Sequence, residues 1–178
     1  MMKFNGENIY LRLLDESDID ERYVSWHIKN DNLKYYSGTR RNYSYESIVD
    51  ELRHARISNK LFIYGIFTIE NDLCIGNIKI GPVIEEHQIS DMIVMIGDSK
   101  YYGRGYAVEA IKVGNQVAFD VYNIRKLYGG MYEDNISSIK SYTKAGWYIE
   151  GRLRGYYLVN GKSMDRILVS CLNPKYFN

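Results

Sequence analysis

The sequence predicts an α+β fold in which about four helices flank one mixed, mostly antiparallel sheet of about six or seven strands. Three strand-like apolar runs follow one another between residues 61 and 96, and the short turns between them favour antiparallel pairing. The chain then continues as strand, loop, helix and strand, which implies a right-handed crossover and one parallel pair. Near the C-terminus, Asn160-Gly161 separates two further runs and predicts a closing hairpin.

The first expected elements are a strand and a helix. Residues 9–13 alternate loosely between apolar and polar, as a half-buried strand does. Ser17, with Asp20 three residues later, has the pattern of a helix cap. The helix that follows is expected to reach about Trp26.

A second helix is expected after a long polar segment. Ser44 has the residue type that caps helices, and the helix runs from it toward Ile57. The segment between the two helices, residues 29–43, is polar, rich in tyrosine and without a clear period. It is interpreted as a loop or a broken helix.

The middle of the chain predicts three consecutive strands. They are expected at residues 61–69, 74–80 and 89–96, where apolar and β-branched residues dominate. Polar segments at residues 70–72 and 85–88 separate them and predict turns.

A glycine-rich segment, residues 102–107 (YGRGYA), joins the third of these strands to a helical pattern that opens at Tyr106. Glycine lets the backbone approach an anion, and the first helical turn offers unpaired N–H groups. The segment therefore predicts a phosphate site, with an ordinary tight turn as the alternative. Small and apolar residues between Ala107 and Val121 recur at helical spacing, which predicts a helix lying on the sheet.

The remaining elements complete the predicted sheet. Residues 127–132 are expected to form the strand after the crossover, and residues 136–145 a helix that Gly146 ends. The hairpin strands are expected at residues 152–159 and 162–172.

Length and charge indicate the class of protein. The 178 residues suit a single domain over residues 1–178, and 46% hydrophobic residues suffice for a core. A net charge of +1 gives no field for nucleic acid, and no apolar run has the form of a signal peptide or a membrane span. We expect a cytoplasmic protein without nucleic-acid or membrane partners. Cys74 and Cys171 lack metal-ligand spacing, so buried reduced thiols and no metal are expected.

The segment from Asn135 to Trp147 (NISSIKSYTKAGW) resembles the pattern of the GNAT superfamily of N-acetyltransferases. In that pattern an Asn precedes a helix that carries Ser, Tyr and Lys, and a Gly and an aromatic residue end it. The family's glycine loop wraps the pyrophosphate of acetyl-CoA, and residues 102–107 resemble that loop, with Gly105 and Ala107 in its two small positions. Tyr102 replaces the commoner Gln or Arg. The resemblance implies a GNAT-like fold and acetyl-CoA as co-substrate.

The resemblance is strongest from Ile75 to Leu172. Residues 75–79, 103–110 and 150–154 resemble the branch that holds ribosomal-protein alanine acetyltransferases, and nucleotide-amino-sugar acetyltransferases share many of the same strings. Two separated motifs in the correct order are a more specific indication than either one alone. A nucleoside-triphosphate enzyme is disfavoured, because no Lys-Ser or Lys-Thr follows the glycine loop.

The resemblance assigns roles in acyl transfer to named residues. Tyr142 matches the tyrosine that donates a proton to the departing thiolate, with packing against CoA as the alternative. Asp91 is ranked first as the group that takes the proton of the amine, ahead of Glu86 and His87. Its alternatives are a solvated carboxylate and a water chain that replaces any single base. A main-chain N–H around residues 94–96 would meet the oxyanion.

Further residues are expected to hold acetyl-CoA. Asn135 and Ser138 would contact its pantetheine arm or phosphates, although Asn135 suits a helix cap equally. Arg104 and Lys144 would approach its phosphates. The full set expected to bind CoA is Met95, Ile96, Tyr102, Gly103, Arg104, Gly105, Tyr106, Ala107, Asn135, Ser138 and Lys144.

The amine acceptor is expected beside the first helix and the strand of Asp91. Trp26, Tyr36 and His87 are assigned to this site, with a core position as the alternative for Trp26. Arg40 and Arg41, among tyrosines of the segment 35–43, favour a nucleotide-linked amino sugar over a protein N-terminus. A CoA-binding module without catalysis is the alternative from another class, and a homodimer is a further expectation.

Overall fold

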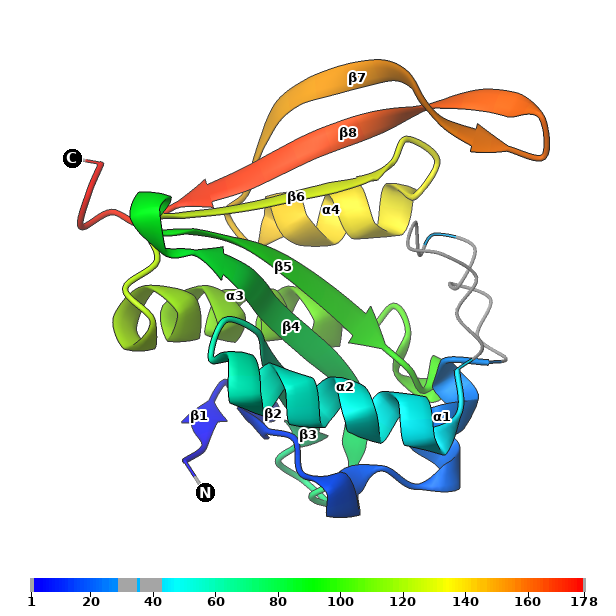
Figure 1. The fold of residues 1–178 in the computed structure, drawn as a ribbon, viewed down its shortest axis with the longest axis vertical. Helices are drawn as coiled ribbons and strands as arrows, with labels where there is room; N and C mark the ends of the chain where they lie inside the picture. The colour runs from blue at the N-terminus through cyan, green and yellow to red at the C-terminus, as the bar shows by residue number, and fades with distance from the viewer. Residues whose placement is uncertain (1, 29–34, 36–42, 178) are drawn as a thin grey trace.

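The computed structural model describes residues 2–28, 35 and 43–177, and its centre is one eight-stranded sheet (Figure 1). The strand order is β1-β2-β3-β4-β5-β6-β8-β7. The strands are β1 (Phe4–Asn5), β2 (Ile9–Leu13), β3 (Phe62–Thr68), β4 (Cys74–Ile84), β5 (Ile89–Ile96), β6 (Lys126–Tyr132), β7 (Tyr148–Val159) and β8 (Lys162–Leu172). The mixed, mostly antiparallel sheet is confirmed. The eighth strand is β1, whose two residues are too short to show a period in the sequence.

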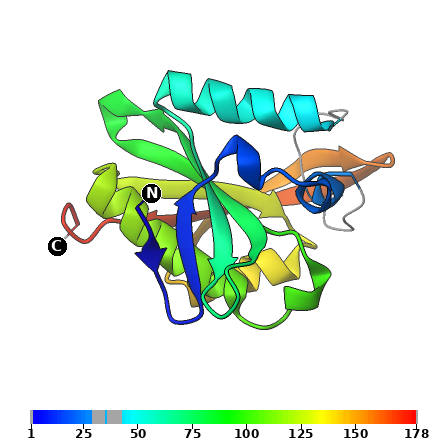
Figure 2. The ribbon, with the colours of Figure 1, turned by 90° about the horizontal axis from the view of Figure 1, so that it is seen from below.

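Helices cover both faces of the sheet (Figure 2). They are α1 (Glu21–Trp26), α2 (Tyr45–Ser58), α3 (Tyr106–Gln116), which continues as a π-helical turn over Val117–Val121, and α4 (Ile136–Lys144). The apolar sides of α1 and α2 pack on one face, and those of α3 and α4 pack on the other.

The helix caps follow the sequence with one correction. Ser44 caps α2 as predicted, because its hydroxyl accepts from the Ser47 amide. The first helix, however, is capped by Asp20, whose carboxylate accepts from the Tyr23 amide at 2.7 Å. Ser17 lies one turn earlier, in a short 3₁₀ turn that Asp15 caps. Two capping sequences follow one another here, and the prediction merged them.

Strand β4 is longer than predicted. It continues past Ile80 through a cis Gly81-Pro82 bond, and the register against β5 shifts between Ile80 and Val83. A proline lacks the amide that a sheet needs, so it is accommodated at this irregularity. The predicted strand, residues 74–80, therefore ended four residues before β4 does.

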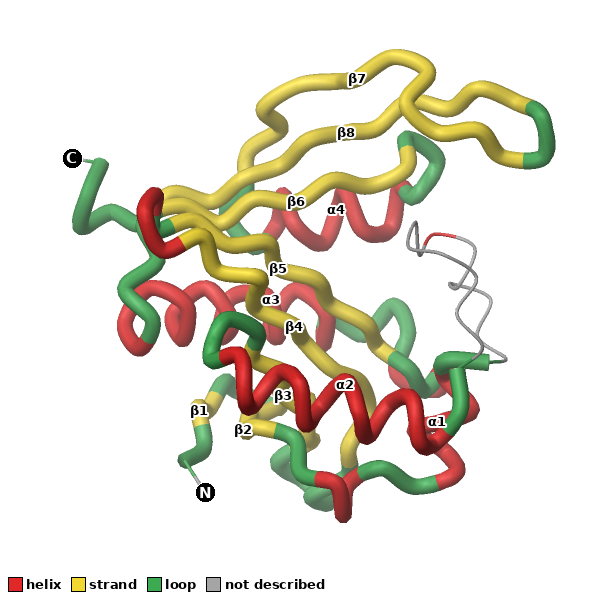
Figure 3. The backbone as a smooth tube through the Cα atoms, in the orientation of Figure 1, coloured by secondary structure: helices red, strands yellow, loops and turns green. Residues whose placement is uncertain are grey.

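The parallel pairing that positions the site involves β5 and β6. α3 connects these two strands, as the expected crossover requires. Their pairing is short, since the last matched pair is Asp91 with Tyr128. Beyond it, β5 stays with β4 and β6 stays with β8, so the two strands separate (Figure 3). A wedge thus opens in the middle of the sheet.

Both cysteines are free, buried thiols, as expected. Cys74 belongs to the core under α1 and α2, and Cys171 to the core under α3 and α4. Among the described residues, no helix has the length and apolar character needed to cross a membrane.

Candidate active site

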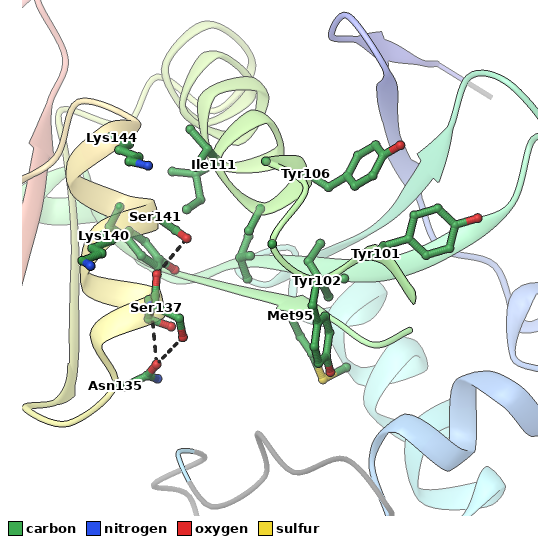
Figure 4. Close-up of a pocket in the computed structure, with 18 residues that line it drawn as sticks. Met95, Tyr101, Tyr102, Tyr106, Ile111, Asn135, Ser137, Lys140, Ser141 and Lys144 are labelled. Carbon is green, nitrogen blue, oxygen red and sulfur yellow. Dashed lines mark hydrogen bonds between the residues drawn. The ribbon is translucent and has the colours of Figure 1, made fainter. Parts of the chain in front are cut away.

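A cavity of about 420 Å³ occupies the wedge between the separated strands. Its walls are the end of β5, the glycine loop, the first turns of α3 and one side of α4 (Figure 4). Ten of the eleven residues expected to bind CoA line it, and they come from residues 95–96, 102–107 and 135–144. The exception is Arg104, which is exposed and lies outside the lining.

The glycine loop presents its backbone to this cavity. Gly105 caps α3 with a φ of +88°, and Gly103 has a φ of +71°, values that other residues rarely adopt. A Cβ at either position would meet no atom within 4 Å, so backbone conformation rather than space requires glycine. The amides of residues 103–108 have no hydrogen-bond acceptor within the part of the chain that the structure describes. Six free donors at a helix N-terminus suit an anion.

Helix α4 supplies a polar wall. The Asn135 carboxamide oxygen accepts from the Ser138 amide at 3.2 Å and from the Ser137 hydroxyl at 3.1 Å. Asn135 is therefore a helix cap that also lines the cavity, and its contact with CoA stays a prediction. The side of α4 that faces the cavity also carries Ser137, Lys140, Ser141 and Lys144 (Figure 4).

Several lining residues were missed by the sequence analysis. Ser137, Lys140 and Ser141 recur with Lys144 at the i, i+3, i+4 and i+7 spacing of one helical face. That spacing could have identified them. The apolar lining residues Tyr101, Val108 and Ile111 could not be told from core residues by pattern.

Tyr142 lies at the inner end of the cavity and is only 6% exposed. Its hydroxyl donates to the Met92 carbonyl on β5 at 2.8 Å. Its ring contacts Trp147 edge to face, with the ring centroids 4.8 Å apart. The Trp147 indole N–H in turn donates to Asn115 of α3 at 3.0 Å, which fixes α4 against α3. Tyr142 is thus held with its hydroxyl on β5.

Asp91 lies on β5 where the two strands begin to separate. Its Oδ1 atom is buried without a hydrogen-bond partner among the described residues. Burial raises the pKa of Asp91 to about 6, although a hydrogen bond from the Met92 amide and the charge of Arg166 both favour the ionised form. The carboxylate does not line the cavity itself. It is nevertheless the kind of group that can take a proton near neutral pH.

Met92 connects the two candidate proton carriers. Its amide bonds to the Asp91 carboxylate and its carbonyl accepts the Tyr142 hydroxyl. A Cβ built at Gly129 on β6 would lie 3.7 Å from Asp91 Oδ1 and 3.8 Å from the Met92 carbonyl oxygen. Both groups therefore border the same gap, which Gly129 leaves open.

The expected acceptor residues are not brought together at this cavity. Trp26 is 5% exposed and packs in the core beside Tyr23, with Gly97 directly against its ring. His87 and Glu86 are exposed in the turn before β5, at the end of that strand away from the cavity. Tyr36 lies outside the described residues.

Arg40 and Arg41 also fall outside the described residues, so the structure says nothing of them. Tyr35 is described. It lies 6.0 Å from Tyr132 of β6, measured between ring centroids.

A comparison with protein families matches residues 8–147 to the acetyltransferase (GNAT) domain. Among curated proteins, the "Probable N-acetyltransferase YjcK" of Bacillus subtilis (strain 168) is 25% identical over 174 residues, which is 95% of this chain and 96% of that protein. The spermidine N(1)-acetyltransferase of Escherichia coli (strain K12) is 27% identical over 101 residues. That match covers 57% of this chain and 54% of the relative.

Solved structures share the fold. The ribosomal-protein-S5-alanine acetyltransferase from Vibrio fischeri aligns with a TM-score of 0.83 and 19% identity, over 100% of both chains. The spermidine N-acetyltransferase from Vibrio cholerae, in complex with CoA and spermine, aligns with a TM-score of 0.81 and 19% identity. That alignment covers 96% of this chain and 99% of the other.

Proposed function

The chain belongs to the acetyltransferase (GNAT) domain family and is an N-acetyltransferase, and from this premise we propose that it moves an acetyl group from acetyl-CoA to a primary amine by direct attack. One observation carries the proposal. A row of free amides at an α-helix N-terminus and a buried tyrosine hydroxyl line one cavity in the wedge of the sheet.

We take residues 1–178 as one such domain. The family match ends at residue 147, but β7 and β8 lie beyond it and complete the same sheet. β8 pairs with β6 over seven matched residues, from Lys126 to Tyr132. The catalytic wedge would therefore lose one of its sides without the C-terminal hairpin.

The glycine loop and α4 would bind CoA together. Its diphosphate carries negative charge, which the amides of residues 103–108 and the positive end of the α3 dipole favour. Lys140 and Lys144 add positive charge on the opposite wall, and Ser137 and Ser141 offer hydroxyls. The pantetheine arm would then run along the wedge toward β5.

The backbone of β5 would stabilise the oxyanion. Successive residues of a strand direct their N–H and C=O groups to opposite sides, so residues i and i+2 direct them to the same side. Since the Met92 carbonyl faces the wedge, where Tyr142 bonds it, the Val94 amide is directed to the wedge as well. Val94 also lines the cavity, so its N–H is our assignment for the oxyanion donor.

The reaction needs two proton transfers. The amine nitrogen attacks the thioester carbonyl, a C–N bond forms, and the C–S bond breaks to release a thiolate. Asp91 would take a proton from the amine, and its pKa of about 6 leaves it ionised at neutral pH. Tyr142 would turn its hydroxyl from the Met92 carbonyl to the sulfur and protonate the thiolate.

For the acceptor we propose a nucleotide-linked amino sugar. Tyrosine rings gather on the strands next to Asp91, where Tyr132 stacks on Tyr157 with centroids 3.9 Å apart and Tyr157 contacts Tyr156 edge to face. Such rings pack well against a sugar or a base.

A polyamine or a protein N-terminus is the second candidate. The E. coli relative is named a spermidine acetyltransferase, and the V. fischeri structural neighbour a ribosomal-protein-alanine acetyltransferase.

A thiol-release assay decides among these acceptors. The purified protein would be given acetyl-CoA with a nucleotide-linked amino sugar, spermidine or a peptide that begins with alanine. We expect CoA release above the rate without amine, and the fastest release with the amino sugar. Release with peptide or spermidine alone would overturn the sugar preference. CoA binding without release on any amine would favour a non-catalytic module.

A further inference from the structure

A charged group that the mechanism above does not use lies beside Asp91. Arg166 of β8 rests on Gly130 of β6, so closely that a Cβ at Gly130 would collide with its Nε atom. On its other side the Tyr156 ring lies 5.0 Å from the guanidinium, and the Tyr156 hydroxyl accepts from Nη1 at 3.1 Å. The guanidinium is therefore held in one place between a bare backbone and an aromatic ring.

Two polar atoms in this part of the molecule lack partners. Of the described residues, Asp91 and Arg166 alone have a buried side-chain oxygen or nitrogen without a hydrogen bond, namely Oδ1 and Nε. The two side chains form no ion pair within 4.0 Å. Each lies against one of two adjacent glycines, Gly129 for Asp91 and Gly130 for Arg166. The Asp91 carboxylate and the Arg166 guanidinium thus lie near each other without contact, next to the two glycines of β6, which have no side chains.

The side chains that the structure describes on this face of the sheet are partly exposed near the two groups. Ile93, two residues after Asp91 on a central strand, is 41% exposed. Arg166 is half-buried and Tyr156 is 53% exposed. Among the described helices, α2 packs against β3 and shares no core cluster with β6 or β8, so it leaves the side of Arg166 uncovered.

On the described strands β4 to β8, every carboxylate other than Asp91 is paired, whereas Arg154 and Lys162 are exposed and have no ion pair. Glu51 of α2 accepts from Lys79 of β4 at 2.6 Å. Glu133 and Asp165 both pair with Arg152. The buried charged groups left without a full set of partners on these described strands are one carboxylate and one guanidinium, which form a zwitterionic pair. A polyamine, which carries several positive charges, would meet a single free carboxylate with an arginine next to it.

We propose that Arg166 binds an anionic group of the acceptor while the acceptor's amine goes to Asp91. The acceptor is therefore an amine with a phosphate or a carboxylate a few bonds away from the nitrogen. A guanidinium fixed in position is well suited to such oxygens, because it donates to them in a fork. This inference rests on the proposed function, and it adds a specificity residue and a substrate class to it.

Binding tests the inference independently of catalysis. Calorimetry on the CoA-saturated protein would compare glucosamine 6-phosphate with glucosamine, and alanine with alaninamide. The members of each pair share an amine and differ in the anionic group. We expect the anionic member of at least one pair to bind about tenfold more tightly, and the two pairs separate phosphate from carboxylate.

Variants locate the effect at Arg166. Arg166→Met should abolish the tenfold difference, and Arg166→Lys should restore part of it. Gly130→Ala keeps the arginine but displaces its guanidinium, so it should weaken the anionic ligand too. Arg154→Met makes the same change at an exposed arginine of the hairpin and should leave all affinities unchanged.

The inference is overturned if neither pair shows a difference, if Arg166→Met binds as the unaltered protein does, or if Arg154→Met is equally defective. Turnover is measured separately, as the release of CoA from acetyl-CoA. If the anionic amines bind through Arg166 but no amine releases CoA from acetyl-CoA, the proposed function fails and the binding inference stands.

Discussion

Met92 shows how single residues organise the chemistry. Its amide donates a hydrogen bond to the Asp91 carboxylate, and its carbonyl oxygen accepts one from the Tyr142 hydroxyl. The hydroxyl and the carboxylate that we propose as proton donor and proton acceptor are thereby held at the same short piece of strand. The side chain of Met92 itself is 1% exposed and packs in the core, so its backbone alone does this.

Tyr142→Phe tests the proton donor. We expect turnover to fall by about a hundredfold, because general acid catalysis typically contributes at least that much. CoA affinity should stay within about twofold, since the ring remains in place against Trp147. Steady-state kinetics and calorimetry with CoA measure the two effects. Tyr148→Phe, which removes an exposed hydroxyl, is the matched control. Unchanged turnover in Tyr142→Phe would remove the residue as the acid.

The pH dependence of turnover tests Asp91. Burial raises its pKa to about 6, and the charged or titratable groups that face it are Arg166 and Tyr128. A base must be deprotonated to act, so kcat/KM should fall about tenfold per pH unit as the pH drops below about 6. Asp91→Asn should lose most activity at pH 7 and lose this acidic limb. An unchanged limb in Asp91→Asn would assign the titration to another group.

Stability tests the same carboxylate without any substrate. The folded-state pKa of Asp91 lies above its ordinary value of 3.8, so the folded protein holds this proton more tightly than the unfolded chain. Its contribution to stability is present below pH 3.8 and is lost as the pH rises through about 6. Asp91→Asn should therefore raise the free energy of unfolding by about 1–3 kcal/mol at pH 8, as measured with denaturant. At pH 4 it should raise the free energy of unfolding only slightly. A variant that is destabilised at pH 8 would contradict the burial cost.

At the scale of elements, the glycine loop and α3 act as one unit. The loop supplies the left-handed residue that starts the helix, and the helix start leaves the amides that face the cavity. The apolar side of α3 lies on the sheet, where Gly114 allows Ile78 and Met92 to approach it. The same helix that packs in the core therefore positions these amides at the cavity.

Two glycines with the same backbone strain separate structure from binding. Gly105 and Gly146 have φ values of +88° and +90°, and a Cβ at either would meet no atom within 4 Å. Alanine at either position should cost about 1–2 kcal/mol of stability. CoA affinity should fall about tenfold or more in Gly105→Ala alone, because Gly146 ends α4 outside the cavity lining. Equal CoA affinities in the two variants, by calorimetry, would remove the loop from CoA binding.

At the scale of the whole molecule, the cavity exists because the sheet is divided. Three matched pairs join β5 to β6, whereas β6 and β8 share seven and β4 and β5 share seven. The sheet thus has two antiparallel parts, β1 to β5 and β6 to β8, which are joined at one end. α3 and α4 lie across the opening between them. The cavity is lined by β5 of the first part and by α4, which follows β6 of the second.

CoA should therefore stabilise the whole fold. With free CoA at about a hundred times its dissociation constant, binding adds about 2.7 kcal/mol. For a chain of this size the melting temperature should rise by about 5–10 °C. Scanning calorimetry with and without CoA measures the shift, and adenosine alone, which lacks the diphosphate, is the control. No shift and no heat of binding would refute the proposed cavity ligand.

Local patterns predicted much of the fold. Ser44 as a cap, the turn at Asn160-Gly161 and the helical stripe after Tyr106 each depend on residues close together in the chain. Local patterns gave the wrong result where two helix-capping sequences follow one another, at Ser17 and Asp20. They also failed where β4 continues through Gly81-Pro82.

The candidate site divides in the same way. The sequence by itself determined the glycine loop, part of the α4 lining (Asn135, Ser138, Tyr142 and Lys144) and the family, because these depend on residue type at fixed spacing. Only the tertiary structure decided that Trp26 is core, that Tyr142 bonds Met92, and that Arg166 lies beside Asp91. These contacts join residues up to 75 positions apart in the sequence. No local pattern of residues predicts the point at which β5 and β6 separate.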